Sequence, residues 1–289
     1  SAIQTQLDAK STASNVTGLS DALVETNSMY IGNDPSSTTN SAQYNVAVGT
    51  TALDAIITGD RNTAVGYNAL TTNTEGSKNT ASGYQALQKN ISGNENTASG
   101  AFVLQENIDG NQNTASGYAA LEENKTGNQN TASGYAALKQ NIDGDGNTAN
   151  GSYALQLNSD GSYNTANGYA ALSENIDGSK NTASGAYALE KNISGIQNTA
   201  SGAYALQKNI DGKENTASGY AALFENTEGK QNTASGYAAL YGNTEGNYNT
   251  ASGYKALVTT EGNSNTALGS FAGDKITTGS NNVIIGRSA

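Results

Sequence analysis

The chain of 289 residues contains no cysteine, no histidine and no tryptophan, and Pro35 is its only proline. Without cysteine it has no disulfide scaffold and no thiol nucleophile, and without histidine it has no imidazole base and no common zinc or copper ligand set. An enzyme is therefore not expected. Hydrophobic residues make up only 35% of the sequence, a low content that is typical of disorder unless repeated units stack on one another.

Positive charge is also scarce, because 14 Lys and Arg face 25 Asp and Glu and the net charge is −11. Nucleic acids and anionic membranes select clustered Lys and Arg, so neither is an expected partner. No apolar run approaches the roughly 20 residues of a transmembrane helix, and the N-terminus lacks the features of a signal peptide. We therefore expect no membrane insertion.

What the sequence does contain is a strict repeat. Asparagine recurs every 17 residues from Asn45 to Asn249, and again at Asn265 and Asn282. We call it the anchor asparagine, at position 0 of the consensus N-T-A-S-G-Y-A-A-L-x-x-N-x-x-G-x-x. Glycine occupies position 4 in every unit, leucine occupies position 8 from Leu53 to Leu257, and most units place a second asparagine at position 11 and a second glycine at position 14. Two glycines and two asparagines per period predict turns rather than helices.

The unit is too short for a helical repeat, so we predict an all-β fold, a parallel β-solenoid of about fifteen 17-residue coils. The alternation in N-T-A-S-G places Thr and Ser on one face and Asn, Ala and Gly on the other. The segment Y-A-A-L predicts a second short strand, and the glycine at position 14 predicts a turn with positive φ. Stacking in register predicts ladders along the solenoid, of asparagine at Asn62, Asn79, Asn96, Asn113 and Asn130, and of leucine at Leu70, Leu87, Leu104, Leu121 and Leu138.

One aromatic residue per coil changes its place. It stands at position 5 in eight units, as at Tyr84, and at position 6 in five, as at Phe102. We interpret this shift as a shared pocket that is filled from either side of a bend.

The first 44 residues do not follow the repeat. Residues 3–10 and 19–23 each carry two apolar side chains four apart, which predicts two short helices, or a coiled-coil stalk, broken at Gly18. Residues 33–40 are rich in turn-forming residues and predict a connector. We therefore expect a stalk-like helical segment and connector over 1–44.

Regular repeats are expected over 45–264 and variant repeats over 265–289. The division follows from the shorter spacing of 16 between Asn249 and Asn265. We predict a deletion within a turn, with the strands kept in register, loss of the second asparagine, and a break in the ladder that leaves Asn243 bonded to water. A distinct capping section then follows.

The segments 62–70 (NTAVGYNAL), 45–49 (NVAVG) and 282–286 (NVIIG) resemble repeats in the heads of trimeric autotransporter adhesins and in phage tail fibres, especially those of marine phages. Residues 3–10 look like the stalk register common in such fibres. The resemblance implies a left-handed parallel β-roll, a homotrimer and a piece of a longer fibre. The adhesin repeat is shorter, and its apolar residue after Ala is mostly Ser here, as at Ser82.

Two surface columns offer candidate sites. Nine units place an acid before the second glycine, and its carboxylates are weak candidate Ca²⁺ ligands at Asp109, Asp143, Asp160 and Asp177. The interpretation we prefer is a turn-favouring acid on a solvated edge, with no metal and no cofactor. The Thr and Ser ranks resemble ice-binding arrays, although a polar face or a trimer interface explains them more simply.

The sequence therefore predicts a structural or adhesive fibre segment, a homotrimeric tail-fibre or surface-adhesin shaft or head. We expect it outside the cell, on a virion or cell surface, where it presents a region that binds a host receptor or glycan. An ice-binding β-solenoid and a glycan-binding module that uses the Tyr column are the alternatives.

Overall fold

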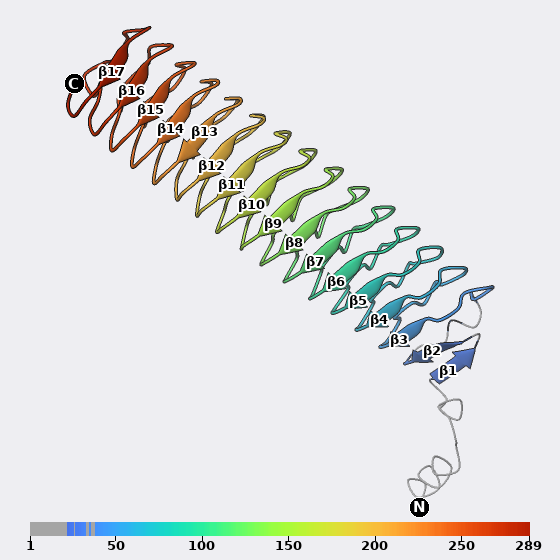
Figure 1. Cartoon of the computed structure of the whole chain (residues 1–289). Helices are drawn as coiled ribbons and strands as arrows, with labels where there is room; N and C mark the ends of the chain where they lie inside the picture. Colours follow the sequence, from blue (N-terminus) through green and yellow to red (C-terminus); the bar gives the residue numbers. More distant parts are fainter. Residues whose placement is uncertain (1–21, 26, 33–34, 36–37) are drawn as a thin grey trace, which may run out of the picture. The chain divides into compact units, whose positions relative to one another are not determined.

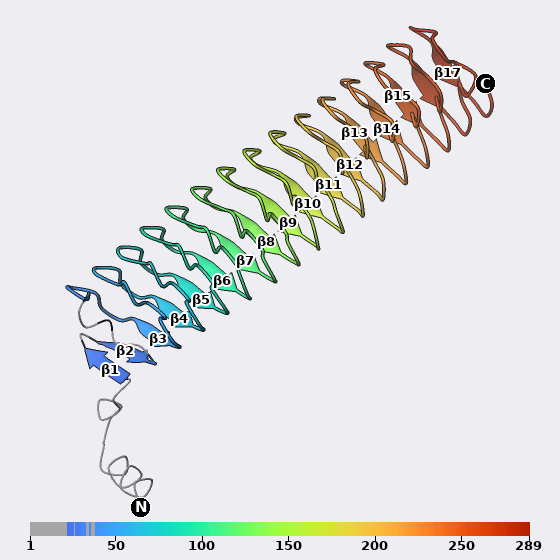
Figure 2. The same ribbon diagram turned by 180° about the vertical axis from the view of Figure 1, so that it is seen from behind.

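A computed structural model shows that the chain is an all-β, parallel β-solenoid with a repeat of about 17 residues (Figures 1 and 2). It divides into two compact units, residues 1–129 and 130–289. The structure describes residues 22–25, 27–32, 35 and 38–289. The helix predicted over 3–10 lies outside the described residues.

The first unit begins with a pair of antiparallel strands, followed by parallel ones. Its strands are β1 (Ala22–Glu25), β2 (Ser28–Ile31), β3 (Val46–Val48), β4 (Thr63–Val65), β5 (Thr80–Ser82), β6 (Thr97–Ser99) and β7 (Thr114–Ser116). The helix predicted over 19–23 is therefore wrong at Ala22 and Leu23, which belong to β1. Pairing with β2 satisfies the backbone groups of this segment, which outweighs the weak helical spacing of two apolar residues.

Parallel stacking starts earlier than the repeat in the sequence suggests. Ser28 lies 17 residues before Asn45 and takes the place of an anchor, because the Asn45 backbone N–H donates to Ser28 Oγ at 2.9 Å. Gly32 takes position 4 of the same coil. The solenoid therefore includes β2, within the 1–44 segment that we expected to be stalk and connector.

In the second unit every neighbouring pair of strands is parallel and in register, each residue paired with its equivalent in the next coil. Its strands are β8 (Thr131–Ser133), β9 (Thr148–Asn150), β10 (Thr165–Asn167), β11 (Thr182–Ser184), β12 (Thr199–Ser201), β13 (Thr216–Ser218), β14 (Thr233–Ser235), β15 (Thr250–Ser252), β16 (Thr266–Leu268) and β17 (Val283–Ile285).

Each repeat strand is only three residues long and alternates as the sequence predicts. In β11, Thr182 and Ser184 are exposed and Ala183 is buried. The interior is narrow, with small alanines on the strand side and a fully buried leucine at position 8, such as Leu172, on the other side. The predicted separation of hydroxyl and core faces is confirmed.

The predicted second strand is wrong. The Y-A-A-L arm is a run of turns in which positions 6 and 8 are left-handed, with φ of 53° at Ala136 and 51° at Leu138. Its backbone still pairs between coils: Leu138 N–H donates to Ala154 O at 2.9 Å, and Tyr153 N–H donates to Tyr135 O at 2.9 Å. Hydrogen bonding that follows the solenoid axis therefore does not require strand geometry.

The two glycine columns serve different purposes. Gly168, at position 4, has φ of +137°, a conformation that L side chains rarely adopt. Gly178, at position 14, was expected to have positive φ, but its column is absent from the residues with positive φ. It must be glycine because a Cβ there would lie 2.4 Å from Asn175 Oδ1 and 2.6 Å from Gly195 O.

The irregular coil keeps its strands in register, since β15 pairs with β16 through Thr250 and Thr266. Buried Thr260 takes the place of the second asparagine, so the missing residue belongs to the following turn, as predicted. The expected bond from Asn243 to water is wrong, because Asn249 Nδ2 donates to Asn243 Oδ1 at 3.1 Å. The anchor ladder also continues, from Asn265 N–H to Asn249 Oδ1 at 2.9 Å.

Replacing a buried leucine should damage the solenoid locally. In the second unit Leu155 is fully buried, so Leu155→Asp buries an unpaired charge, which costs about 3–5 kcal/mol. Hydrogen exchange should lose protection in that coil and its two neighbours, because each repeat is stabilised by the adjacent repeats. Leu157→Asp is the matched control, since Leu157 is 37% exposed, and it should change little. Equal loss of protection throughout the unit would contradict nearest-neighbour stabilisation.

Candidate functional site

The interior of each coil is held by two asparagines that donate to one carbonyl. In the coil that begins at Asn164, Nδ2 of Asn164 donates to Gly178 O at 2.7 Å, and Nδ2 of Asn175 donates to the same oxygen at 2.9 Å. Asn164 Oδ1 accepts the backbone N–H of Asn181 in the next coil at 3.0 Å. Asn175 Nδ2 also donates to Asn158 Oδ1 of the preceding coil at 2.7 Å. The anchor ladder thus joins side chain to backbone, whereas the second ladder joins amide to amide.

The residues predicted to form ladders all lie in this interior. Each is fully buried: Asn62, Asn79, Asn96, Asn113, Asn130, Leu70, Leu87, Leu104, Leu121 and Leu138. Within the first unit, Asn79 N–H donates to Asn62 Oδ1 at 2.9 Å and Asn96 N–H donates to Asn79 Oδ1 at 3.0 Å. These side chains hold the cross-section, and a functional surface must be built from other columns.

The amide ladder generates a pH-dependent prediction for Asn175→Asp. Both groups that receive the Nδ2 protons, Gly178 O and Asn158 Oδ1, are acceptors. A carboxylate would face them without a proton, so burial and this arrangement should raise the pKa of the introduced group above about 3.9. The folded state then favours the protonated form. The variant should be least destabilised below about pH 4 and should lose further stability as the pH rises toward the raised pKa.

Urea unfolding at acid and neutral pH, each against the parent chain, measures this difference. Asn263→Asp is the matched control, because the exposed Asn263 side chain acts as an acceptor, of the Asn247 backbone N–H at 2.7 Å and of Asn247 Nδ2 at 3.3 Å. Asp60 already performs that role for the Gln43 N–H at 2.7 Å. An equal pH dependence of the two variants would contradict the donor requirement at Asn175.

The hydroxyl face is formed by strand positions 1 and 3. In the second unit, both residues are exposed in β8 and in β11 to β14. The serine rank is interrupted in β9 and β10, where Asn150 Nδ2 donates to Asn167 Oδ1 at 3.0 Å. The face is therefore a regular array of Thr beside a rank of mixed composition.

The candidate metal ligands are exposed side chains at the turn between positions 11 and 14. Asp143, Asp160 and Asp177 follow one another on successive coils of the second unit, and in the first unit Asp109 accepts a hydrogen bond from Ser92 Oγ at 2.6 Å. Among the described residues, no three His, Cys, Asp or Glu side chains come together as metal ligands would. Their arrangement fits the solvated edge that we preferred.

The aromatic residues form a continuous ladder within each unit. Rings from positions 5 and 6 meet in one column: Tyr84 and Phe102 lie 5.2 Å apart in the first unit, and Tyr204 and Tyr220 lie 5.5 Å apart in the second. The column lies on the surface, since Tyr84 is 47% exposed, so the interpretation of a shared pocket is wrong. Desolvation and the neighbouring Tyr169 and Tyr204 raise the pKa of Tyr187 above its ordinary value.

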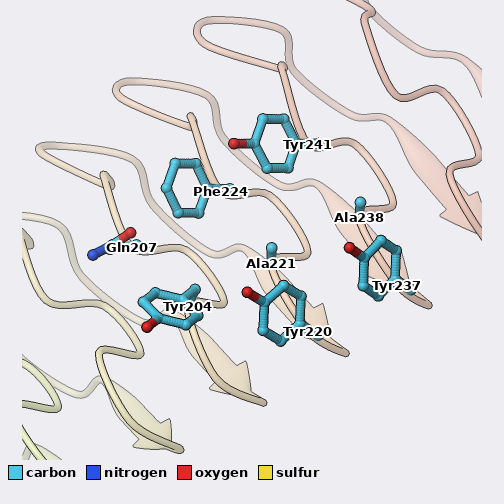
Figure 3. A pocket seen from close by; sticks show the side chains of 8 residues that line it. All are labelled: Tyr204, Gln207, Tyr220, Ala221, Phe224, Tyr237, Ala238 and Tyr241. Atoms are coloured by element: carbon cyan, nitrogen blue, oxygen red, sulfur yellow. The ribbon is translucent and has the colours of Figure 1, made fainter.

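A second row of rings lies beside this ladder in one part of the second unit. Phe224 and Tyr241 stand at position 9, and their rings stack 4.9 Å apart at 2°. Figure 3 shows Ala221 and Ala238 between this pair and the tyrosine ladder. The result is an open trough of about 390 Å³ with aromatic walls and an alanine floor.

Sequence reasoning missed this trough. Its signal was present, because position 9 holds polar or small residues in most coils and an aromatic side chain only in these two. The repeat consensus leaves position 9 undefined, so it does not record that two coils carry an aromatic residue there.

No helix within the described residues is long and apolar enough to cross a membrane. Comparison with known proteins gives no relative: no protein-family model, no curated protein and no solved structure matches the chain.

Proposed function

We propose that this chain is a structural and adhesive fibre segment, a tail-fibre or surface-adhesin shaft or head that holds a receptor-binding region away from a virion or cell surface. The observation that carries the proposal is the register of the coils. Within each unit, successive strands pair residue for residue at the repeat distance, so each added repeat extends the unit by the same cross-section. A protein whose useful property is length is built in this way.

The proposal includes three further features: a left-handed roll, an N-terminal stalk and a location outside the cell. They rest on the resemblance of the repeat to adhesin heads and tail fibres.

A net charge of −11 supports the absence of a nucleic-acid partner, because phosphate backbones repel an acidic surface.

We also propose a parallel homotrimer, because two apolar columns remain exposed along the second unit. Tyr169 at position 5 is 48% exposed, and Ile176 at position 12 is 40% exposed. Some other coils of the unit repeat these exposed side chains, as at Tyr254 and Ile210. Three chains around one axis would cover stretches of such columns, and cyclic symmetry allows one column to meet a different one on the next chain.

Sedimentation equilibrium tests the trimer. The chain should sediment at three times its monomer mass of 29.4 kDa, and deletion of residues 1–21 should weaken the trimer without unfolding the solenoid. This deletion retains β2, which pairs in parallel with β3. A folded, monodisperse monomer for the intact chain would remove the trimer from the proposal.

The hydroxyl face supports a second candidate function, ice binding. In β11 and β12, Thr182 and Thr199 are exposed and paired in register, which gives the regular rank of hydroxyl groups that the ice-binding alternative requires.

Thermal hysteresis measured by nanolitre osmometry separates the two functions. A fibre segment should show none, whereas an ice-binding face should show activity that Thr199→Tyr abolishes. Lys191→Tyr, which changes an exposed residue outside the strands, should then leave the activity intact.

A further inference from the structure

The trough beside the tyrosine ladder exists because two adjacent coils combine the consensus arrangement at positions 5 and 6 with an aromatic ring at position 9. In the coils of Tyr187 and Tyr204 the ring stands at position 6. In the next two coils the ring returns to position 5, as Tyr220 and Tyr237, and position 6 holds the small residues Ala221 and Ala238. The space that a position 6 ring would occupy is therefore open over two coils.

The walls of the trough offer edges and hydroxyl groups rather than ring faces. Tyr220 and Tyr237 stack on each other at 8°, with centroids 5.3 Å apart, so each covers a face of the other. Phe224 is covered on one face by Tyr241 and carries the Lys208 ammonium 5.1 Å from its centroid. A ligand in the trough would thus meet aromatic C–H edges, the alanine methyl groups of the floor and the phenol groups of the walls.

The lining is uncharged. It consists of Tyr, Phe and Ala with one amide, Gln207, at the end where Tyr204 stands (Figure 3). Lys208 lies nearby, but its ammonium is paired with Glu225 at 2.8 Å. Phenol and amide groups both donate and accept hydrogen bonds, so an uncharged lining on a chain of net charge −11 selects a neutral ligand rich in hydroxyl groups over an anionic one.

Two other classes of occupant fit less well. An extended peptide binds by adding main-chain hydrogen bonds to a free strand edge. Here the backbone groups beside the trough pair between coils, as Ala238 N–H does with Tyr220 O at 2.9 Å. A second copy of the chain would use columns that recur in every coil, whereas the position 9 rings occur in two coils only.

We propose that the trough lined by Tyr220, Tyr237, Phe224 and Tyr241 binds a neutral saccharide of one or two pyranose rings. Its volume of about 390 Å³ lies at the small end of ligand sites, which favours a mono- or disaccharide unit. The ring hydroxyls pair with the phenols and with Gln207, and the apolar C–H face lies on Ala221 and Ala238. This site does not depend on the fibre proposal, because it is local to two coils of the second unit.

Saturation-transfer NMR with lactose, cellobiose and maltose tests the site, with 3′-sialyllactose as the anionic comparison. The decisive variant combines Tyr220→Ala with Ala221→Tyr, which copies the natural Ala203 and Tyr204 arrangement and moves a ring into the trough. Because the fold already accepts that arrangement, circular dichroism should not change. At least one neutral disaccharide should bind with a dissociation constant of about 1 mM or lower, and the variant should weaken it about tenfold or more.

The matched control makes the same exchange outside the trough, three coils before the coil of Tyr220, combining Tyr169→Ala with Ala170→Tyr, and should bind as the parent does. Three results would overturn the proposal: no binding of any neutral sugar at about 10 mM, equal binding by the trough variant, or stronger binding of 3′-sialyllactose. A change of sedimenting mass in the trough variant would also overturn it, by identifying the trough as a contact between chains. The sugar-binding results do not bear on coil register, and the sedimenting mass of the parent chain tests the trimer separately.

Discussion

The carbonyl oxygen of the glycine at position 14 fixes the cross-section of each coil. Two buried amides donate to it, from the anchor asparagine and from the second asparagine, as Asn198 and Asn209 do at Gly212 with distances of 2.8 and 3.1 Å. A buried carbonyl with both lone pairs occupied by side-chain amides leaves no polar group unsatisfied. The approach is so close that a Cβ on Gly212 would lie 2.2 Å from Asn209 Oδ1. One interaction therefore explains three columns of the repeat.

The remaining columns follow from that cross-section. Both ladders transmit its register from coil to coil, because each anchor oxygen accepts a backbone N–H of the next coil. A buried leucine and small alanines fill the space that is left. Where the second asparagine is missing, buried Thr260 occupies its site, the strands keep their register and the anchor ladder continues from Asn249 to Asn265. Stability thus rests more on satisfied polar groups than on a large apolar core.

The period, the β class and the alternation of exposed and buried residues at positions 0 to 4 were predictable, because they depend on spacing alone. The conformation of the Y-A-A-L arm was not, since nothing in Ala136 or Leu138 signals a left-handed residue, and only the neighbouring coils stabilise that conformation. Ser28 could not be recognised from the repeat pattern for a different reason. Its hydroxyl oxygen accepts the backbone N–H that an asparagine side-chain oxygen accepts in other coils, although the residue is not asparagine. The trough escaped prediction because a consensus suppresses the departures, here Phe224 and Tyr241, that distinguish one coil from another.

The left-handed residues also bear on how such a chain acquires its structure. Most coils hold non-glycine residues with positive φ at positions 6, 8 and 16, for example Ala170, Leu172 and Lys180 with φ of 53°, 54° and 60°. Each costs on the order of 1 kcal/mol when no neighbour compensates it. An isolated coil is therefore not stable in this conformation. A folded coil stabilises the next one, because it offers hydrogen-bond partners to the backbone of that coil. Assembly of the solenoid is then limited by its first nucleus, and later repeats add in sequence by zippering onto a growing end.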